Sequence, residues 1–558
     1  MLSGYTIGDY LLDRLAQTGI THLFGVPGDY NLQFLDHVLN HAHITWVGCA
    51  NELNAAYAAD GYARCKPAAA LLTTFGVGEL SAINGIAGSY AEYVPVIHIA
   101  VGPAFLSQHK RELLHHTLGD GEFDHFFRMA AEVTAIAARL TTANATAEID
   151  RVVGEALRRR RPVYLFLPLD VASAPTENRP CPLPIPEPVC SDASLQAFVD
   201  AATEILATAN SVSLLADFLA QRFGAAKSLQ RWLDHISLPH ATLLMGKSTL
   251  NEQHPCFTGT YAGHASDEKI RALIEDVDVV ICVGVRFIDT ITAGFSHQIP
   301  TEKSIDIQPD TTRVGHKTFS NIPMLTAIEA LEKITSAFSS RWRHAAITPP
   351  ALPSSDEKDN KLDQRGFWRQ IQRFLKPGDI LVTEQGTSCF GAAALTLPQH
   401  CQFIVQPLWG SIGYALPAAF GAQIAAPERR VVLLIGDGAL QLTAQELGSI
   451  IRDDLKIVIF VINNQGYTVE RAIRGPEQRY NDIAAWNWTQ LPAALGADGD
   501  NVFCRRTTSL SQLAQTLDEI NSEPRLSLVE VILPKMDMPK LLQSVTRSLA
   551  QRNTTRRS

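Results

Sequence analysis

The chain has 558 residues, of which 46% are apolar and 19% charged, with 36 Gly and 30 Pro. This length predicts several domains, and the composition excludes a disordered, collagen-like or coiled-coil protein. The formal net charge of −9 lacks the basic excess that binding to a phosphate backbone usually requires, so we expect a small-molecule partner and no nucleic acid.

The cysteines and the amino-terminal residues indicate the cellular compartment. Nine cysteines are scattered along the chain without a CxxC pair, which is typical of reduced thiols and not of a disulfide framework or a structural zinc site. Asp9 and Asp13 lie where a signal peptide needs an uninterrupted apolar core, and no apolar run is long enough to cross a bilayer. We therefore expect a cytoplasmic protein without membrane contact.

Two stretches interrupt the alternation of short apolar runs with longer amphipathic ones. Residues 174–189 contain six prolines, too many for a helix or a central strand, which predicts an extended connector. Residues 347–364 combine proline, serine and charge. The chain is thereby divided into three segments, for which we set the boundaries 1–178, 190–345 and 365–558.

Each segment contains apolar runs of strand length. They are residues 96–101 and 163–167 in the first segment, 279–283 in the second, and 380–382, 431–435 and 457–462 in the third. Runs that are apolar at consecutive positions suit strands that are buried on both faces, as in parallel sheets flanked by helices. We therefore predict an α/β protein with three doubly wound parallel-sheet domains.

The most specific pattern lies in the third segment. The run 431–435 ends at Gly436, Asp437 and Gly438, and the run 457–462 ends at Asn463 and Asn464. Between them, a single helix from about Ala439 is predicted by the apolar face Leu440, Ala444, Leu447 and Ile451. Because the two strands of such a βαβ unit are parallel, Asp437 and Asn464 should emerge at the same carboxyl edge of the sheet, where open sheets bind ligands.

The residues at this edge offer the oxygen ligands that Mg²⁺ prefers. Asp437 supplies a carboxylate, Asn464 an amide oxygen, and the turn at Gln465 and Gly466 a backbone carbonyl. Gly436 and Gly438 allow the backbone to approach an anion closely, and the amides of the following helix point at it. We predict a site for magnesium and a diphosphate. The sequence Gly119-Asp120-Gly121 follows no apolar run and has no matching Asn pair, so there we predict a simple turn.

Beyond this unit the chain resembles the thiamine-diphosphate-dependent 2-oxo acid decarboxylases of pyruvate and indolepyruvate decarboxylase type, and most of all the bacterial indolepyruvate decarboxylases. The resemblance covers almost the whole chain, through GVPGDYNL (25–32), NELNAAYAADGYAR (51–64), HHTLGDGEF (115–123), PLWGSIGYALPAAFG (407–421) and NNQGYTVE (463–470). It implies a pyrimidine-binding, a central Rossmann-like and a diphosphate-binding domain in this order. It also implies non-oxidative decarboxylation of a 2-oxo acid to an aldehyde and CO₂ through a thiamine diphosphate enamine.

The resemblance assigns roles to individual residues. Glu52 would activate the aminopyrimidine of the cofactor, Gly410 would accept a hydrogen bond from its amino group, and Ile412 would support its bent shape. Mg²⁺ would be bound by Asp437, Asn464 and Gly466, and the polar residues over the reacting carbon, which handle protonation and product release, would be Asp29, His115, His116 and Glu470. Taken alone, Glu52 is a helix first-turn carboxylate and Asp29 a turn residue, and the two histidines lack a third ligand at a spacing typical of zinc.

The substrate preference is predicted from the size of two side chains. Where pyruvate-specific relatives have bulky aromatics, this chain has Thr290 and Cys389, near Gln385 and Phe390. The smaller volume favours aromatic 2-oxo acids such as indolepyruvate or phenylpyruvate, or branched and long-chain ones, over pyruvate. Cys389 stands where the resemblance leads us to expect Ala, and we expect Leu542 and Val545 to close the pocket.

The resemblance further implies at least a homodimer, and we expect a homotetramer built as a dimer of dimers, because the two halves of each site would come from different chains.

Three alternative functions stay open at this point. The first is a thiamine-diphosphate-dependent carboligase of acetohydroxyacid synthase type. The second is a nicotinamide-dependent oxidoreductase that uses the loop at Gly76 and Gly78, in which Ser81 replaces the third glycine of the fingerprint. The third is a non-catalytic nucleotide-binding scaffold.

Overall fold

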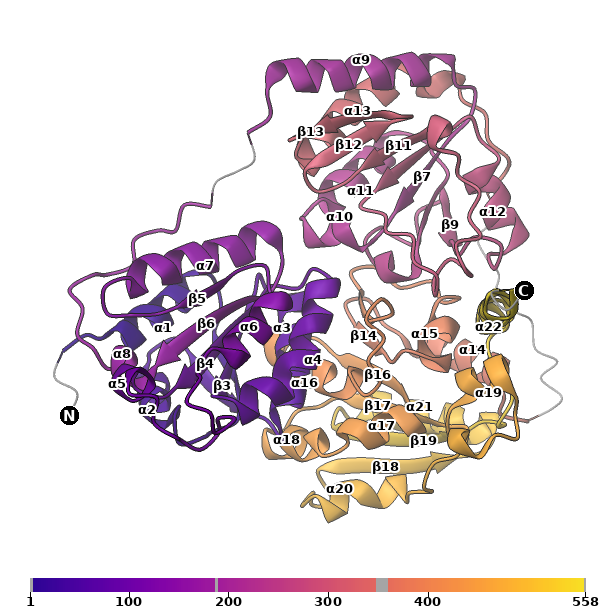
Figure 1. The fold of residues 1–558 in the computed structure, drawn as a ribbon. Coiled ribbons are helices and arrows are strands. Elements are labelled where there is room, and N and C mark those ends of the chain that lie inside the picture. Colours follow the sequence, from indigo (N-terminus) through magenta and orange to yellow (C-terminus); the bar gives the residue numbers. More distant parts are fainter. Residues whose placement is uncertain (1–3, 186–188, 348–359, 556–558) are drawn as a thin grey trace.

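The computed structural model describes residues 4–185, 189–347 and 360–555. It has three sheets that follow one another along the chain, each flanked by helices, and Figure 1 shows them as three lobes. The predicted fold class is therefore confirmed. Among the helices that the structure describes, none combines the length and the apolar character that a membrane crossing would need.

The first sheet has six parallel strands in the order β2-β1-β3-β4-β6-β5. Its central strands β3, β4 and β6 are buried at every position, which explains why their sequences are apolar without alternation. The strands are β1 (His22–Gly25), β2 (Thr45–Gly48), β3 (Ala69–Thr74), β4 (Val96–Gly102), β5 (Ala137–Arg139) and β6 (Val163–Pro168), and the helices are α1 (Ile7–Gln17), α2 (Leu32–Asn40), α3 (Glu52–Cys65), α4 (Val77–Ala91), α5 (Phe105–His109), α6 (His125–Glu132), α7 (Ala145–Arg159) and α8 (Leu169–Ala172).

The second sheet has seven strands in the order β13-β12-β11-β10-β7-β8-β9. Five of them are parallel, as predicted, but β12 and β13 extend the edge in antiparallel direction. The strands are β7 (Val212–Ala216), β8 (His240–Thr242), β9 (Phe257–Thr260), β10 (Val279–Val283), β11 (Ser304–Ile307), β12 (Thr311–Val314) and β13 (Lys317–Ser320), the α-helices are α9 (Asp192–Thr208), α10 (Phe218–Arg222), α11 (Ala226–His235), α12 (Glu268–Glu275) and α13 (Met324–Phe338), and the 3-10 helices are η1 (Leu244–Gly246), η2 (Thr301–Lys303) and η3 (Ser339–Arg341).

The third sheet has six parallel strands in the order β15-β14-β16-β17-β19-β18, which is the order of the first sheet with each strand in the corresponding place. Its strands are β14 (Ile380–Thr383), β15 (Gln402–Ile404), β16 (Val431–Gly436), β17 (Val458–Asn463), β18 (Val502–Thr507) and β19 (Leu526–Ile532), its α-helices are α14 (Gln364–Phe374), α15 (Thr387–Ala392), α16 (Ala415–Ala425), α17 (Asp437–Thr443), α18 (Glu446–Arg452), α19 (Thr468–Arg474), α20 (Leu491–Ala494), α21 (Leu510–Ser522) and α22 (Lys540–Thr555), and its 3-10 helices are η4 (Arg479–Asn481) and η5 (Trp488–Gln490).

One element of the predicted βαβ unit is wrong. The single helix expected after Gly438 is two helices, α17 and α18, and the first of them begins at Asp437. The chain tightens between them, because the N–H groups of Leu447 and Gly448 donate to the carbonyls three residues earlier, at Ala444 and Gln445. The apolar face still points inward, since Leu440, Ala444 and Leu447 are buried.

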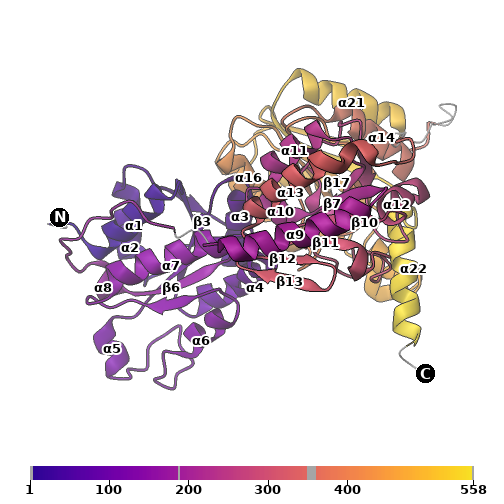
Figure 2. The same ribbon diagram turned by 90° about the horizontal axis from the view of Figure 1, so that it is seen from above.

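The two connectors differ in how much of them is described. Over residues 174–185 and 189 the chain has no helix or strand, only an isolated bridge between Pro175 and Thr6, so the predicted extended connector is confirmed there. Of the second connector, residues 348–359 lie outside the described residues, and α14 begins at Gln364. Figure 2 shows α9, which follows the first connector, lying along the second lobe.

Helices α3 and α16 join the first lobe to the third within one chain (Figure 1). Each helix has a glycine where the backbone of the other passes. A Cβ atom at Gly61 would lie 2.1 Å from the carbonyl oxygen of Ala418, and one at Gly421 would lie 1.8 Å from that of Ala58. Buried alanines fill the rest of the contact, so the two backbones approach more closely than larger side chains would allow.

We expect Gly421→Ala to destabilise the protein by at least about 1–3 kcal/mol, because the added methyl group has no space against the carbonyl of Ala58. The free energy of unfolding in urea measures the effect. The matched control is Gly448→Ala in α18, where the added Cβ meets nothing within 4 Å and the better helix propensity should leave stability equal or raised by up to about 1 kcal/mol. Equal stability of the two variants would contradict this close packing.

Candidate active site

Asp437 and Asn464 lie side by side at the carboxyl edge of the third sheet, as predicted, because they follow the neighbouring parallel strands β16 and β17. Asp437 accepts hydrogen bonds from the N–H groups of Gly438 (2.8 Å) and Gly466 (3.1 Å). Both side chains are buried. The turn after β17 is held from its other side by Arg471, which donates to the carbonyl of Asn464 at 3.4 Å.

Three oxygen atoms meet at this point. The amide oxygen of Asn464 lies 3.3 Å from Oδ1 of Asp437 and 3.0 Å from the carbonyl oxygen of Gly466, with no hydrogen-bond donor facing it. Neighbouring ligands in an octahedron with Mg–O bonds of about 2.0–2.1 Å lie about 2.9 Å apart. The donor set and its spacing therefore fit Mg²⁺, and the oxygens repel one another unless a cation lies between them.

The electrostatics of Asp437 agree with this fit. Burial raises the pKa of Asp437 to about 6, against the opposing effect of the backbone N–H groups of Gly438, Gly466 and Gln465. A raised pKa means that the ionised carboxylate lacks sufficient compensating positive charge in its surroundings. A divalent cation at this position would supply that charge and favour the ionised form.

Gly410 and Ile412 lie on the loop that precedes α16, and this loop is held in place by a residue that the sequence did not single out. Oε2 of Glu384, at the end of β14, accepts hydrogen bonds from the N–H groups of Gly413 (3.0 Å) and Ala415 (3.1 Å). Burial raises the pKa of Glu384 to about 7, against three backbone N–H groups that lower it. The only signal in the sequence was an acidic residue at the end of an apolar run.

Side chains of the first lobe fix the same loop from the other side. The hydroxyl groups of Tyr57 in α3 and Ser411 are 2.6 Å apart, and the amide of Asn84 in α4 donates to both, at 3.0 and 3.1 Å. Trp409 donates to the oxygen of the same Asn84 amide at 2.9 Å. The segment between Trp409 and Ile412 therefore has a fixed position relative to α3 and α4.

Glu52 is the first residue of α3 and is half-buried, with Asn51 as the helix N-cap. Its side chain lies over Gly78, where a Cβ atom would come within 3.0 Å of Oε1. Gly78 therefore makes room for the carboxylate. This contact explains why the glycine loop at Gly76 and Gly78 lies beside Glu52, and it gives that loop a role that does not require a nucleotide.

Asp29, His115 and His116 are brought together from different parts of the first lobe. Nε2 of His115 lies 2.6 Å from Oδ2 of Asp29, and Nε2 of His116 lies 3.9 Å from Oδ1. One carboxylate oxygen and one ring nitrogen from each histidine lie within 4.8 Å of one another. His115 also stacks on Tyr30, with ring centroids 4.9 Å apart.

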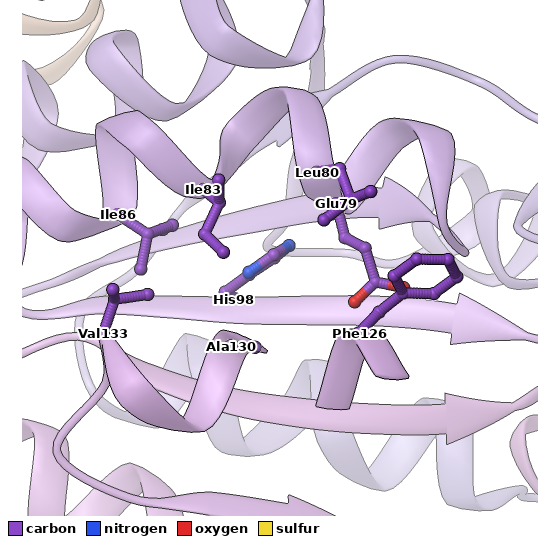
Figure 3. Close-up of a pocket in the computed structure, with 8 residues that line it drawn as sticks. All are labelled: Glu79, Leu80, Ile83, Ile86, His98, Phe126, Ala130 and Val133. Atoms are coloured by element: carbon purple, nitrogen blue, oxygen red, sulfur yellow. The ribbon is translucent and has the colours of Figure 1, made fainter. Parts of the chain in front are cut away.

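His116 has a strained backbone that is supported from inside the lobe. Its φ is +59°, and its carbonyl oxygen lies so close to Gly76 that a Cβ atom there would be 2.0 Å away. Glu79 in α4 fixes Gly76 by accepting its N–H at 2.8 Å, and it accepts the hydroxyl of Tyr164 at 2.7 Å. Figure 3 shows Glu79 and His98 among the side chains that line a small cavity in the first lobe.

Burial shifts the pKa of both titratable groups that line this cavity. Burial raises the pKa of Glu79 to about 7, and the hydrogen bonds from Tyr164 and Gly76 lower it by less. Burial lowers the pKa of His98 to about 3, so its imidazole is neutral, and it pairs with the hydroxyl of Thr73 at 2.9 Å. The support behind His116 is therefore a buried polar network in which the imidazole of His98 is neutral and Glu79 can take up a proton near neutral pH.

Glu470 lies apart from Asp29 and the two histidines. It is an exposed residue of α19 in the third lobe, two positions after Thr468. The structure thus places the polar candidates in two groups. Asp29, Glu52, His115 and His116 belong to the first lobe, whereas Glu470 and the three clustered oxygen atoms of Asp437, Asn464 and Gly466 belong to the third.

The side chains predicted for the substrate pocket are mostly buried. Cys389 and Phe390 lie in α15, which packs against α22 with its buried Leu542 and Val545. The thiol of Cys389 donates to the side-chain oxygen of Gln385 at 3.2 Å. Thr290 is half-buried and donates to the carbonyl of Pro407, next to the loop of Gly410, at 3.4 Å. The pocket itself stays a prediction.

Comparison with known proteins bears on both groups of polar residues, the one in the first lobe and the one in the third. The family model described as thiamine pyrophosphate enzyme, N-terminal TPP binding domain, matches residues 5–125. The models of the central domain and of the C-terminal TPP binding domain match residues 199–333 and 384–531. An alpha-keto-acid decarboxylase of Mycobacterium tuberculosis is 48% identical over 553 residues, which is 98% of this chain and 97% of that protein. This chain belongs to the thiamine-diphosphate-dependent 2-oxo acid decarboxylases.

Further members of this decarboxylase family are similar over the same length. Alpha-keto-acid decarboxylases of Mycobacterium ulcerans and Mycobacterium avium are 47% and 46% identical, over 98% and 99% of this chain and 96% and 98% of their own. In this decarboxylase, the N-terminal model spans Asp29, Glu52, His115 and His116, and the C-terminal one spans Gly410, Asp437, Asn464 and Glu470. Each of the two cofactor-binding models therefore contains one of the two groups of polar residues.

Proposed function

We propose that this chain, with thiamine diphosphate and Mg²⁺ bound, decarboxylates aromatic or long-chain 2-oxo acids to the aldehyde and CO₂ in preference to pyruvate. The observation that carries the proposal is the cluster of three oxygen atoms from Asp437, Asn464 and Gly466, in a chain that belongs to this family. The cluster offers a cation the ligands through which a diphosphate is held. All nine cysteines are unpaired, which supports the cytoplasmic location that we also propose.

In this proposal the third lobe holds the diphosphate end of the cofactor. Asp437, Asn464 and the carbonyl of Gly466 would bind Mg²⁺, while Gly436 and Gly438 leave the backbone free to approach the diphosphate. When bound, thiamine diphosphate would supply a nucleophilic carbon, C2, and a cationic thiazolium ring that can take up the electron pair left behind by CO₂. The loop of Gly410 and Ile412, fixed by Glu384 and Ser411, would orient the ring system.

The remaining polar residues would handle protons. Glu52 would hold a proton at a ring nitrogen of the cofactor's pyrimidine, which a half-buried carboxylate can share. Asp29, His115, His116 and Glu470 would deliver a proton to the carbon that loses CO₂ and would assist release of the aldehyde. The 2.6 Å contact between Oδ2 of Asp29 and Nε2 of His115 supports transfer of a proton within this group.

The arrangement of the two groups supports a site shared between chains. Glu52 lies at one lobe and Asp437 at another, so we propose that two chains pair and that each supplies half of each site. Large apolar side chains are exposed next to both groups: Val77 and Leu80 in α4, Met129 in α6, Trp409 beside Gly410, and Leu442 in α17. Their burial in a second copy would stabilise a homodimer, and we propose that two dimers form a homotetramer.

The preference for large substrates rests on side-chain volume. Thr290 and Cys389 are smaller than the aromatic residues that pyruvate-specific relatives have there. Thr290 donates to the carbonyl of Pro407, next to the loop of Gly410, and Cys389 lies in α15, which packs against α22. Removing ring volume from a pocket leaves space that a longer substrate fills with apolar contact. Indolepyruvate and phenylpyruvate are the substrates that we propose first.

Assay of a series of 2-oxo acids tests the reaction and the preference together. With thiamine diphosphate and Mg²⁺ we expect aldehyde and CO₂, and kcat/KM for phenylpyruvate or indolepyruvate about 10-fold or more above that for pyruvate. Equal values would contradict the substrate preference. An acyloin product would favour a carboligase, and activity that depends on a nicotinamide and not on thiamine diphosphate would favour an oxidoreductase.

Mixing two inactive variants tests the shared site. We expect Glu52→Gln and Asp437→Asn each to abolish turnover. When the two proteins are dissociated and re-associated in equal amounts, activity should return to about a quarter of the wild-type value, because half of the dimers are hybrids and each hybrid has one intact site. Each variant treated alone is the control. If the mixture stays inactive although mass spectrometry detects hybrids, both residues of a site come from one chain.

A further inference from the structure

The side chain of Asn464 can face the oxygen cluster in two ways, and only one of them makes a cation site. As placed, its amide oxygen faces Asp437 and the carbonyl of Gly466. If the amide were rotated by half a turn, its nitrogen would lie 3.3 Å from Oδ1 of Asp437 and 3.0 Å from the Gly466 carbonyl, and would donate to both. An amide nitrogen offers no lone pair to a metal ion and points its hydrogens at it. The rotated form therefore satisfies the oxygens with hydrogen bonds and excludes a cation.

Thr468 lies at the other end of this amide. Its Oγ1 is 3.0 Å from the amide nitrogen of Asn464 as placed, and Thr468 is buried at the start of α19. Its N–H also donates to the carbonyl of Gly466 at 3.0 Å. Thr468 thus contacts two of the three residues that supply the oxygen cluster, without supplying a ligand itself.

The hydroxyl proton of Thr468 decides which end of the amide can face it. Oγ1 donates that proton to the carbonyl of Lys535, just after β19, at 3.0 Å. A hydroxyl group has one proton to donate and two lone pairs that accept. With the proton directed at Lys535, Oγ1 can only accept, so it favours the nitrogen of Asn464 and disfavours the oxygen. The rotated amide would require Thr468 to give up its bond to Lys535.

We propose that Thr468 is a positioning residue that orients the Asn464 amide so that its oxygen faces the cation, an inference that rests on the cation site of the proposed function. The chain of contacts runs from the Lys535 carbonyl through the Thr468 hydroxyl and the Asn464 amide to the oxygen cluster. Its effect is to prevent the cluster from satisfying itself with hydrogen bonds when no cation is present. Partners that orient a metal ligand in this way typically contribute about 10- to 100-fold to metal affinity.

The test starts from the full-length protein freed of cofactor and metal, to which thiamine diphosphate is added at a fixed concentration. Mn²⁺ is the probe, and its binding is titrated. Electron paramagnetic resonance measures the Mn²⁺ that stays free. Thr468→Val keeps the shape but removes the hydroxyl, and should weaken Mn²⁺ binding by about 10- to 100-fold. Thr468→Ser keeps the hydroxyl and should bind within about 3-fold of the wild type. Thr468→Ala replaces the valine variant if valine lowers the melting temperature of the cofactor-free protein.

A second background separates orientation from packing. In Asn464→Asp both side-chain ends are oxygen, so there is no amide to orient and Thr468→Val should change Mn²⁺ affinity by less than about 3-fold. An equal loss in both backgrounds would overturn the inference, because it would show that Thr468 acts through packing. Wild-type affinity in Thr468→Val would overturn it as well. If the wild-type protein itself fails to bind Mn²⁺, the cation site is wrong, and the inference falls with the proposed function.

Discussion

The rest of the site depends on one constraint: the amide oxygen of Asn464 lies within hydrogen-bond distance of two other oxygen atoms, on Asp437 and Gly466, with no donor facing it. Such a cluster is unfavourable unless a cation or a rotated amide relieves it. The fold creates it by ending β16 and β17 at the same edge of a parallel sheet, so that Asp437 meets the turn at Asn464 and Gly466. Burial then raises the pKa of Asp437 and strengthens the demand for positive charge.

The close packing of α3 and α16 connects this edge to the first lobe. Because glycines let the two backbones touch, Tyr57 in α3 reaches Ser411 in the loop before α16, although the two residues are 354 positions apart. The same helix α3 begins with Glu52. In the dimer that we propose, α3 would therefore take part in two sites, one through Glu52 and the other through the loop that Tyr57 holds.

The sequence predicts the central strands and the meeting of Asp437 with Asn464 because both leave local patterns. Strands such as β4 and β16 are almost entirely buried, so their residues are apolar in succession, and parallel pairing brings Asp437 and Asn464 to one edge. Strands β12 and β13 left no such pattern because many of their side chains are only half-buried or exposed. Glu384 and Thr468 act through tertiary contacts that no spacing in the sequence reveals. The break between α17 and α18 could not be predicted because the apolar face, from which one helix was predicted, continues across it.

The most direct test of the oxygen cluster is calorimetric titration of the cofactor-free protein with thiamine diphosphate, once with Mg²⁺ and once with EDTA. If the cluster holds a cation that in turn holds the diphosphate, binding with Mg²⁺ should be at least about 10-fold tighter than binding with EDTA, a difference of about 1.4 kcal/mol or more. Equal affinity under the two conditions, or no binding under either, would contradict the central role given to Asp437, Asn464 and Gly466.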